Sequence, residues 1–140
     1  MKPALAAVCI LALAACSDPR APDGRVIVRD QPGGQIVKHE RQRERLAEAD
    51  GVILCGQINS AATIFISLPN ACACADARFG FHGARVGHYP SPEGTATMAG
   101  YYPPRLREWF LRHAAHLILT DYVTLSARDL AAMGALEICE

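Results

Sequence analysis

Ser60 and His82 are the two side chains whose types and positions in this sequence are best suited to chemistry. Ser60 lies between an apolar run that opens at Val52 and a second apolar segment that begins at Ala61. We expect a buried strand before the serine and a helix after it, which would place its hydroxyl among unpaired N–H groups. His82 ends another predicted strand, and a histidine within reach can take the proton of an attacking hydroxyl. The pair therefore predicts a serine nucleophile with a histidine base.

Both residues also have a structural interpretation. A serine directly before an apolar helix is a good N-cap, and N-cap serines greatly outnumber nucleophiles. His82 can equally be a buried histidine whose ring nitrogens are satisfied. Because Phe79 and Phe81 alternate with it, the histidine is expected to leave its strand on the face opposite the phenylalanines. His88, in the segment that follows, is a rival base.

Three short motifs surround this pair: Gly56-Gln57-x-x-Ser60-Ala61, Leu68-Pro69-Asn70, and Ala77-Arg78-Phe79-Gly80-Phe81-His82. They resemble the serine and histidine segments of the Clp protease proteolytic subunit, which belongs to the Clp/crotonase superfamily. The resemblance covers roughly Val26 to Gly134 and is closest to small uncharacterised periplasmic members with the same GFH motif and a later YPPxxRxW segment, here Tyr102 to Trp109. It implies an α/β fold, a small Clp/crotonase-like domain of βαβ repeats.

The resemblance also implies roles for further residues. Pro32-Gly33-Gly34 resembles the family's glycine turn, so the N–H groups of Gly34 and Ala61 are expected to form an oxyanion hole. The aspartate of the family's triad stands just before a Leu-Ser-Ala segment, which here begins at Leu125. Asp121 is the candidate, although it lies one residue out of the expected register. A Ser–His dyad is therefore the alternative to a triad.

The function predicted from these residues is a serine hydrolase, a peptidase or other acyl hydrolase, that needs no cofactor. The main alternative is a non-catalytic lipoprotein of the same fold that binds a peptide or a protein partner. A third reading is a purely structural component of the cell envelope. No metal site is predicted, because His113 and His116 are three residues apart but have no convincing third ligand.

A βαβ unit must position the glycine turn and the serine. Residues 25–29 form the first credible strand, and residues 35–50 a crossover helix whose charged middle predicts a solvated face. The next strand covers residues 52–55, and residues 56–59 are expected to be a turn. Because sites in open α/β sheets lie at the carboxyl ends of parallel strands, we expect the turn and Ser60 to meet at that edge.

The second half of the chain is expected to be a long loop followed by two helices. Residues 83–100 are rich in glycine and proline, which predicts either a lid over the site or a mobile surface loop. A helix with one apolar stripe is expected from Pro103 or Pro104. After an extended segment, Ser126 and Asp129 predict a capping box that opens the last helix.

The beginning of the chain predicts export. Residues 1–15 contain a basic Lys2 and an apolar stretch too short to span a bilayer, which is typical of a signal peptide. Leu13-Ala14-Ala15-Cys16 resembles a bacterial lipobox, whose cysteine carries a diacylglycerol. The alternative is an ordinary signal peptide whose cleavage site happens to precede a cysteine.

The resulting organisation has residues 16–24 as a tether and residues 25–140 as one domain. A lipidated Cys16 would hold the protein to a membrane of the bacterial cell envelope, facing the periplasm. The serine that follows favours the outer membrane. The chain has 14 basic and 14 acidic residues, a balance that gives no indication of binding to nucleic acid. The oligomeric state is left open.

Four cysteines lie within the predicted domain: Cys55, Cys72, Cys74 and Cys139. An even number in an oxidising compartment predicts two disulfides, with buried free thiols as the alternative. A Cys72–Cys74 bridge is the least favourable pairing, because two residues so close on an extended strand have poor geometry for it. Cys139 is therefore expected to pair with one of the other three.

Overall fold

The structure, a computed structural model, describes residues 18–118 and 121–140. The predicted signal peptide and the predicted lipidation site, Cys16, lie outside the described residues. The domain is mixed α/β, as expected from the sequence. Within the described residues no helix has both the length and the apolar character needed to cross a membrane.

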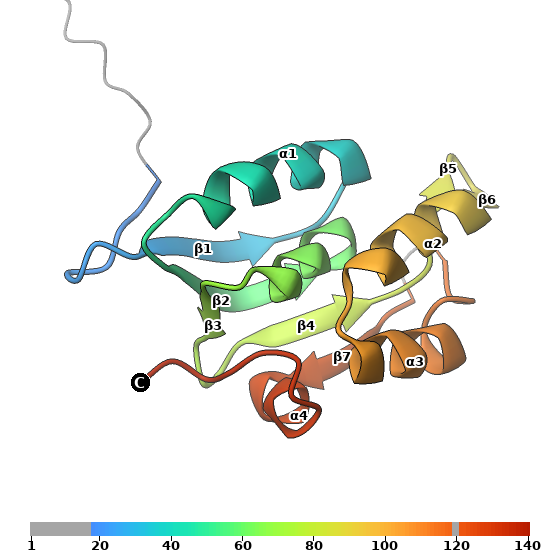
Figure 1. The fold of residues 1–140 in the computed structure, drawn as a ribbon. Coiled ribbons are helices and arrows are strands. Elements are labelled where there is room, and N and C mark those ends of the chain that lie inside the picture. Colours follow the sequence, from blue (N-terminus) through green and yellow to red (C-terminus); the bar gives the residue numbers. More distant parts are fainter. Residues whose placement is uncertain (1–17, 119–120) are drawn as a thin grey trace, which may run out of the picture.

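One mixed sheet forms the centre of the domain (Figure 1). Its strands run in the order β1 (Val26–Gln31), β2 (Val52–Asn59), β4 (Arg78–Phe81) and β7 (Val123–Ser126). The first three are parallel, and β7 runs antiparallel to β4. The short β3 (Ala71–Ala73) also pairs with β2, so the first part of β2 is bonded to β3 and its last part to β4.

The helices lie around this sheet. They are α1 (Ile36–Ala47), the 3₁₀ helix η1 (Ser60–Ser67), α2 (Pro92–Tyr101), α3 (Pro104–His113) and α4 (Ala127–Ala132). η1 is apolar nearly all round, and its residues from Ala61 to Ile66 are buried. It contacts α1, α2 and strands β2, β3 and β4, so the helix that begins with Ser60 lies inside the core.

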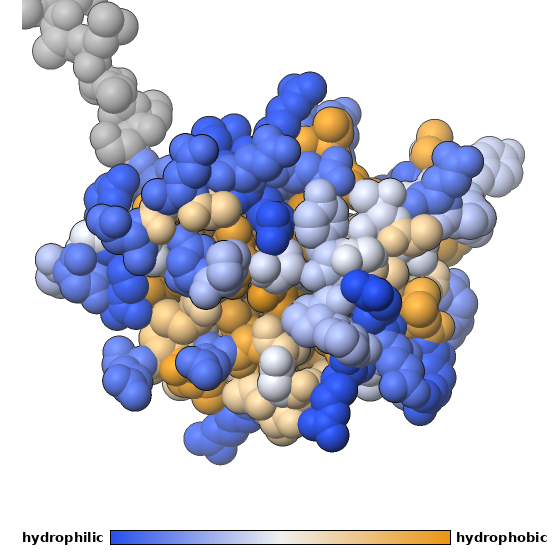
Figure 2. Space-filling view, in the orientation of Figure 1, coloured by the Kyte–Doolittle hydropathy of each residue, from blue (hydrophilic) through white to orange (hydrophobic). Residues whose placement is uncertain are grey.

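The helix α1 separates a charged surface from this core. Its charged middle was expected to be a solvated face, and hydrophilic side chains do cover the outside of the molecule over α1 (Figure 2). Leu46 and His39 are the residues of α1 that are buried. The His39 ring packs against Phe65 of η1, with ring centroids 5.7 Å apart.

The predicted turn at residues 56–59 is wrong, because β2 continues through them to Asn59. Gly56 has a φ of +67° and Asp30 opposite has a φ of +48°, where the register between β1 and β2 shifts. Asp30 Oδ1 accepts a hydrogen bond from the Gln57 N–H (2.9 Å). The Asp30 side chain thus replaces a backbone acceptor at this bulge. The strand β2 therefore continues past Gly56, which the sequence predicted to be its end.

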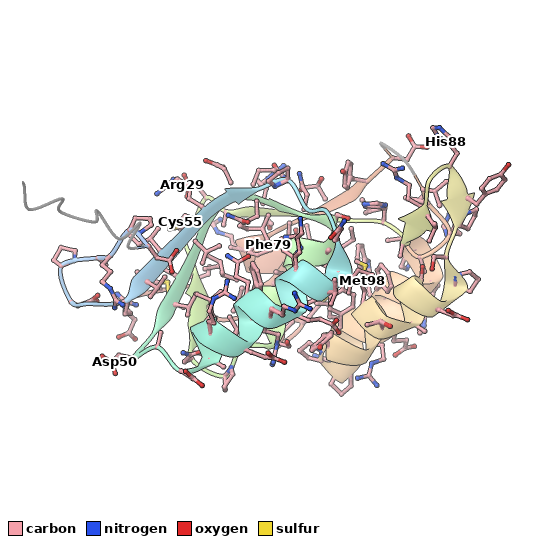
Figure 3. The ribbon with its side chains drawn as sticks, turned by 90° about the horizontal axis from the view of Figure 1, so that it is seen from above. Arg29, Asp50, Cys55, Phe79, His88 and Met98 are labelled. Atoms are coloured by element: carbon pink, nitrogen blue, oxygen red, sulfur yellow. A yellow bond between two sulfur atoms is a disulfide. The ribbon has the colours of Figure 1, made fainter. Side chains whose placement is uncertain are left out.

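The predicted long loop at residues 83–100 is also wrong. A small hairpin, β5 (Arg85–Val86) with β6 (Tyr89–Pro90), is followed directly by α2 (Figure 3). Ser91 caps α2, because its Oγ accepts a hydrogen bond from the Gly94 N–H (3.1 Å), and a proline stands in the first turn. Ser-Pro-Glu is a helix-start signal that the surrounding glycines and prolines obscured.

Two helix starts predicted from the sequence are confirmed. α3 begins at Pro104, with Leu106 and Phe110 of its apolar stripe fully buried. α4 begins after Ser126, whose hydroxyl accepts from the Asp129 N–H while the Asp129 carboxylate accepts from the Ser126 N–H. This is the expected capping box.

The segment 19–24, part of the predicted tether, is bonded to the start of β1. The Ile27 N–H donates to the Pro19 carbonyl (2.8 Å) and the Ala21 N–H to the Arg25 carbonyl (2.9 Å). Asp23 adds an ion pair with Arg25 (2.7 Å). The chain from residue 19 onward is therefore attached to the domain.

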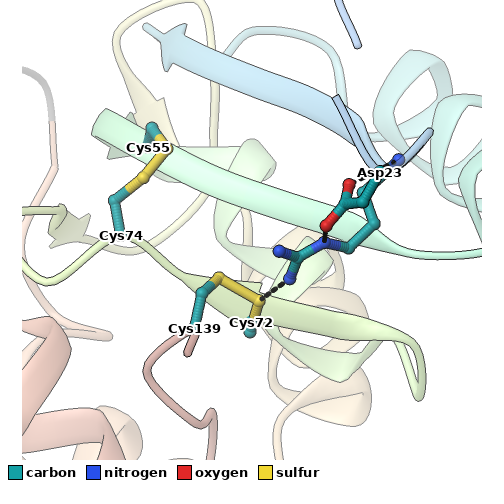
Figure 4. Close-up of a disulfide and its surroundings, with 6 residues drawn as sticks. Asp23, Cys55, Cys72, Cys74 and Cys139 are labelled. Atoms are coloured by element: carbon teal, nitrogen blue, oxygen red, sulfur yellow. Dashed lines mark hydrogen bonds and ion pairs between the residues drawn. A yellow bond between two sulfur atoms is a disulfide. The ribbon is translucent and has the colours of Figure 1, made fainter. Parts of the chain in front are cut away.

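Two disulfides are present, as predicted, and they join Cys55 to Cys74 and Cys72 to Cys139 (Figure 4). The first links β2 to the chain just after β3, where the partner of β2 changes from β3 to β4. The second ties the carboxyl-terminal segment to β3, beside a bridge between Ala73 and Ile138.

Candidate active site

Ser60 stands at the junction of β2 and η1 in a conformation that serines rarely adopt. Its φ is +56°, in the left-handed region, which costs a non-glycine residue about 1–3 kcal/mol. Asn59, not Ser60, occupies the N-cap position, and the Ser60 hydroxyl contacts His82 instead of capping the helix. Strain of this kind persists only where the surrounding structure fixes it.

A buried hydrogen-bond network holds the Ser60 backbone. The Thr63 hydroxyl donates to the Ser60 carbonyl (2.6 Å), and the Tyr102 hydroxyl lies 2.6 Å from the same Thr63 oxygen. Because the single hydroxyl hydrogen of Thr63 goes to Ser60, Tyr102 must be the donor in the second bond. Both side chains are buried. The sequence did not single them out, although Thr63 is a polar residue within an otherwise apolar run.

His82 is bonded to Ser60. Its Nε2 lies 2.7 Å from the Ser60 Oγ, within the range expected for a nucleophile and its base. The His82 ring is buried, at 5% exposure. Burial lowers the pKa of His82 below its usual 6.5, the Gly83 backbone opposes this shift, and the positive charge of Arg85 adds to it. The ring is therefore predominantly neutral at pH 7.

No carboxylate among the described residues pairs with the second ring nitrogen of His82. Nδ1 is buried and has no hydrogen-bond partner among the described residues. Asp121, the predicted third member of a triad, is solvent-exposed, and the described hydrogen bonds do not join it to His82. Its neighbour Tyr122 contacts the histidine instead, edge to face, with ring centroids 4.8 Å apart. The structure thus brings Ser60 and His82 together, but not Asp121.

The glycine turn lies against Ser60. Gly33 and Gly34 have φ values of +95° and +135°, which favour glycine. A Cβ placed on Gly33 would lie 2.6 Å from the Cβ of Ser60, so no other residue lets the backbone approach so closely. A Cβ on Gly34 would lie 3.8 Å from the Cε1 of His39, whose Nδ1 donates to the Gln35 carbonyl (3.0 Å).

An open cleft of about 620 Å³ unites these elements. Gly34, Ser60, Ala61 and His82 all line it, so the two residues expected to supply oxyanion-hole amides border the same space as the Ser–His pair. Ala61 is in the first turn of η1, where backbone N–H groups lack partners within the helix. Apolar residues from α1, α2 and the segment after β4 complete the lining, among them Ile36, Met98 and Ala84.

The other histidines are not part of this site. His88 is exposed in the hairpin between β5 and β6, away from the sheet (Figure 3). His113 and His116 are exposed as well. Among the residues that the structure describes, no group of three or more histidine, cysteine or acidic side chains is arranged to hold a metal ion.

Tyr122 is the functional candidate that the sequence did not reveal. It lines the cleft and packs on His82 from the segment that leads into β7. Its proximity depends on the antiparallel pairing of β7 with β4, a long-range contact without a local sequence signal.

A scan against known protein families and a search of curated proteins found no match to this chain.

Proposed function

We propose that this chain is a serine hydrolase, a peptidase or other acyl hydrolase. Ser60 is the nucleophile and His82 the general base. The observation that carries the proposal is the 2.7 Å contact between the Ser60 Oγ and the His82 Nε2 at the edge of an open cleft. The left-handed conformation of Ser60 supports it, because backbone strain of this kind gathers at active sites.

The reaction follows from these positions. Ser60 Oγ attacks the carbonyl carbon of the substrate, and its proton passes to His82 Nε2. The carbonyl oxygen becomes an anion, which the N–H groups of Gly34 and Ala61 would stabilise. When the tetrahedral intermediate collapses, His82 gives the proton to the leaving group and the acyl group stays on Ser60. A water molecule, deprotonated by His82, then releases the acid and restores the serine.

The protonation state of His82 suits the first step. Its lowered pKa keeps the imidazole neutral at pH 7, so Nε2 can accept a proton. The productive tautomer carries its hydrogen on Nδ1, which has no carboxylate partner among the described residues. We therefore propose a Ser–His dyad, with Asp121 outside the catalytic machinery.

The fold and location are proposed on separate grounds. A parallel βαβ unit, a glycine turn after β1 and a serine after β2 support a Clp/crotonase-like domain. Two disulfides support an oxidising compartment, which fits the cell envelope. The lipobox-like sequence that ends at Cys16 supports a lipid anchor that faces the periplasm, and Ser17 after it favours the outer membrane.

One observation favours the alternative, a lipoprotein that binds a peptide or protein partner without catalysis. A buried Nδ1 that has no acceptor in the described part of the chain gives no stabilisation to the imidazolium that forms during attack. A cleft of this size would accommodate a peptide segment whether or not the dyad reacts.

Labelling with a fluorophosphonate probe tests the proposal. The mature protein should be labelled, and both Ser60→Ala and His82→Ala should lose the label. Ser91→Ala is the matched control, since Ser91 is a second serine that lines the cleft. Label retained by Ser60→Ala would assign the reactive group elsewhere. Folded wild-type protein that neither takes the label nor hydrolyses activated esters would favour the binding protein.

A further inference from the structure

We propose that the cleft selects acyl substrates that carry a carboxylate close to the scissile carbonyl, and that Arg85 binds this carboxylate. The inference rests on the proposed hydrolase function and narrows its substrate class. It joins three observations: the charge of the cleft lining, the position of Arg85 after His82, and the apolar residues of the same lining.

Among the described residues that line the cleft, Arg85 is the one permanently charged side chain. No described aspartate or glutamate lines the cleft. The ion pairs among the described residues are Asp23–Arg25 and Glu108–Arg112, so Arg85 has no carboxylate partner in the part of the chain that the structure describes. An arginine without a counter-ion at the mouth of a cleft attracts an anionic ligand, and its planar group pairs well with a carboxylate.

Arg85 is held near the dyad. It follows His82 by three residues, which keeps their Cα atoms within about 10 Å of each other. Its Nη1 donates to the Gly87 carbonyl in the hairpin turn, and its other N–H donors have no partner among the described residues, so they are available to a ligand. The charge also acts on His82, whose pKa it lowers in addition to the larger effect of burial.

The apolar part of the cleft lining favours an aliphatic acyl chain. Ile36, Ala84 and Met98 supply apolar surface in the same cleft, and Met98 lies where α2 approaches the beginning of α1 (Figure 3). A Cβ on Gly94 would lie 2.8 Å from the Ala84 Cβ and 3.2 Å from the Ile36 Cδ1, so α2 packs closely there. The lining thus offers apolar contact to the acyl chain of a substrate whose carboxylate binds Arg85.

Several compounds share this chemistry. They include half-esters and half-amides of short dicarboxylic acids, and peptides with an acidic residue at the cleavage site or a free carboxyl terminus next to it. In each, the carboxylate is held at Arg85 while the carbonyl carbon approaches Ser60 Oγ, and the bond cleaved is the ester or amide bond.

A pair of esters of equal acyl chain length provides the test. Mono-p-nitrophenyl glutarate carries the carboxylate, and p-nitrophenyl valerate replaces it with a methyl group. We expect wild-type kcat/KM to be at least about tenfold higher for the glutarate ester, equivalent to about 1.4 kcal/mol. Arg85→Gln should remove this advantage. Arg128→Gln, which removes the same charge on α4, should leave it unchanged.

A binding measurement keeps the test decisive if neither ester is hydrolysed. Titration of the Ser60→Ala protein with glutarate should give a Kd that Arg85→Gln weakens at least about tenfold and Arg128→Gln does not change. Turnover that survives Ser60→Ala would overturn the role of Ser60 as the nucleophile. Ser60-dependent turnover without a preference for the glutarate ester, or a preference that Arg85→Gln leaves intact, would overturn only the carboxylate site. Glutarate that fails to bind would overturn it too.

Discussion

At the scale of single residues, the His82 ring is oriented by packing. In serine hydrolases with a triad, a carboxylate has this role. The ring is fixed by the Ser60 hydroxyl on one side and by the Tyr122 ring on another. Burial keeps it neutral, and no acid pairs with Nδ1 among the described residues. This arrangement positions the base well but gives little stabilisation to its protonated form, which predicts slower catalysis than a complete triad.

The pH dependence of hydrolysis follows from the lowered pKa of His82. The base must be neutral, and kcat/KM reports the pKa of the free enzyme, so the rate should rise with pH and reach half its maximum below pH 6.5. The measurement is a profile of kcat/KM with an ester substrate between about pH 4.5 and 8. A midpoint at or above 6.5 would contradict the burial argument.

Substitution of Tyr122 should separate packing from hydrogen bonding. Tyr122→Ala removes the ring that contacts His82, so we expect kcat to fall about tenfold or more with a smaller change in KM. Tyr122→Phe keeps the ring and should retain most of the activity. A shift in the pH midpoint of Tyr122→Ala toward the usual histidine value would accompany the loss, because the imidazole becomes more exposed to water. Equal losses in both variants would instead assign a role to the hydroxyl.

At the scale of elements, the glycine turn and the start of η1 are one unit. The turn approaches Ser60 so closely that Gly33 has no room for a side chain. Thr63 and Tyr102 fix the same serine from the core side through its carbonyl. Ser60 is therefore held between a loop and a buried network, which explains how its unusual backbone conformation is maintained.

A comparison of two glycines tests this unit. Gly33→Ala should reduce kcat/KM by about 100-fold, because displacement of a nucleophile by about 1 Å has effects of that size. Gly24→Ala is the control: Gly24 also has a positive φ, +89°, but a Cβ there would meet nothing within 4 Å. Both variants carry backbone strain of about 1 kcal/mol, so only the first should lose activity. Full activity in Gly33→Ala would contradict the close contact with Ser60.

The sequence predicts the elements of the site better than their connections. The parallel βαβ unit, the helix after Pro104 and the capping box at Ser126 follow from local patterns. The continuation of β2 past Gly56 does not, because the acceptor that preserves it comes from Asp30 on another strand. Tyr102 is also beyond local reasoning, since its partner Thr63 lies 39 residues away. Apart from the helix capped by Ser91, what sequence reasoning missed are long-range contacts, which have no periodicity.

At the scale of the whole molecule, two crosslinks stabilise a small domain. Cys55–Cys74 spans 19 residues and Cys72–Cys139 spans 67. The chain-entropy model gives about 3 and about 4 kcal/mol for loops of these lengths. The longer one also retains the last residues beside β3, where the Cys139 N–H donates to the Ala73 carbonyl (2.9 Å).

Removal of each disulfide should therefore lower the unfolding free energy of the domain by a different amount. We expect the Cys72→Ser/Cys139→Ser protein to lose more unfolding free energy in urea than the Cys55→Ser/Cys74→Ser protein, by about 1 kcal/mol. Each pair is replaced together, so no free thiol remains to form new bridges. The reverse order would indicate that the bridge between β2 and the chain after β3 contributes through local packing, which the entropy argument leaves out.

The two ends of β1 lie next to different parts of the molecule. Residues 19–24 attach at its amino end, whereas the glycine turn and the cleft follow its carboxyl end, about 20 Å away along six residues (Figure 1). If Cys16 carries lipid, the amino end of β1 lies nearer the bilayer. The carboxyl end, with the cleft, then faces the periplasmic fluid. Its substrates then arrive by diffusion from that fluid rather than laterally within the lipid, and water-soluble acids would reach Ser60 more readily than membrane-dissolved esters.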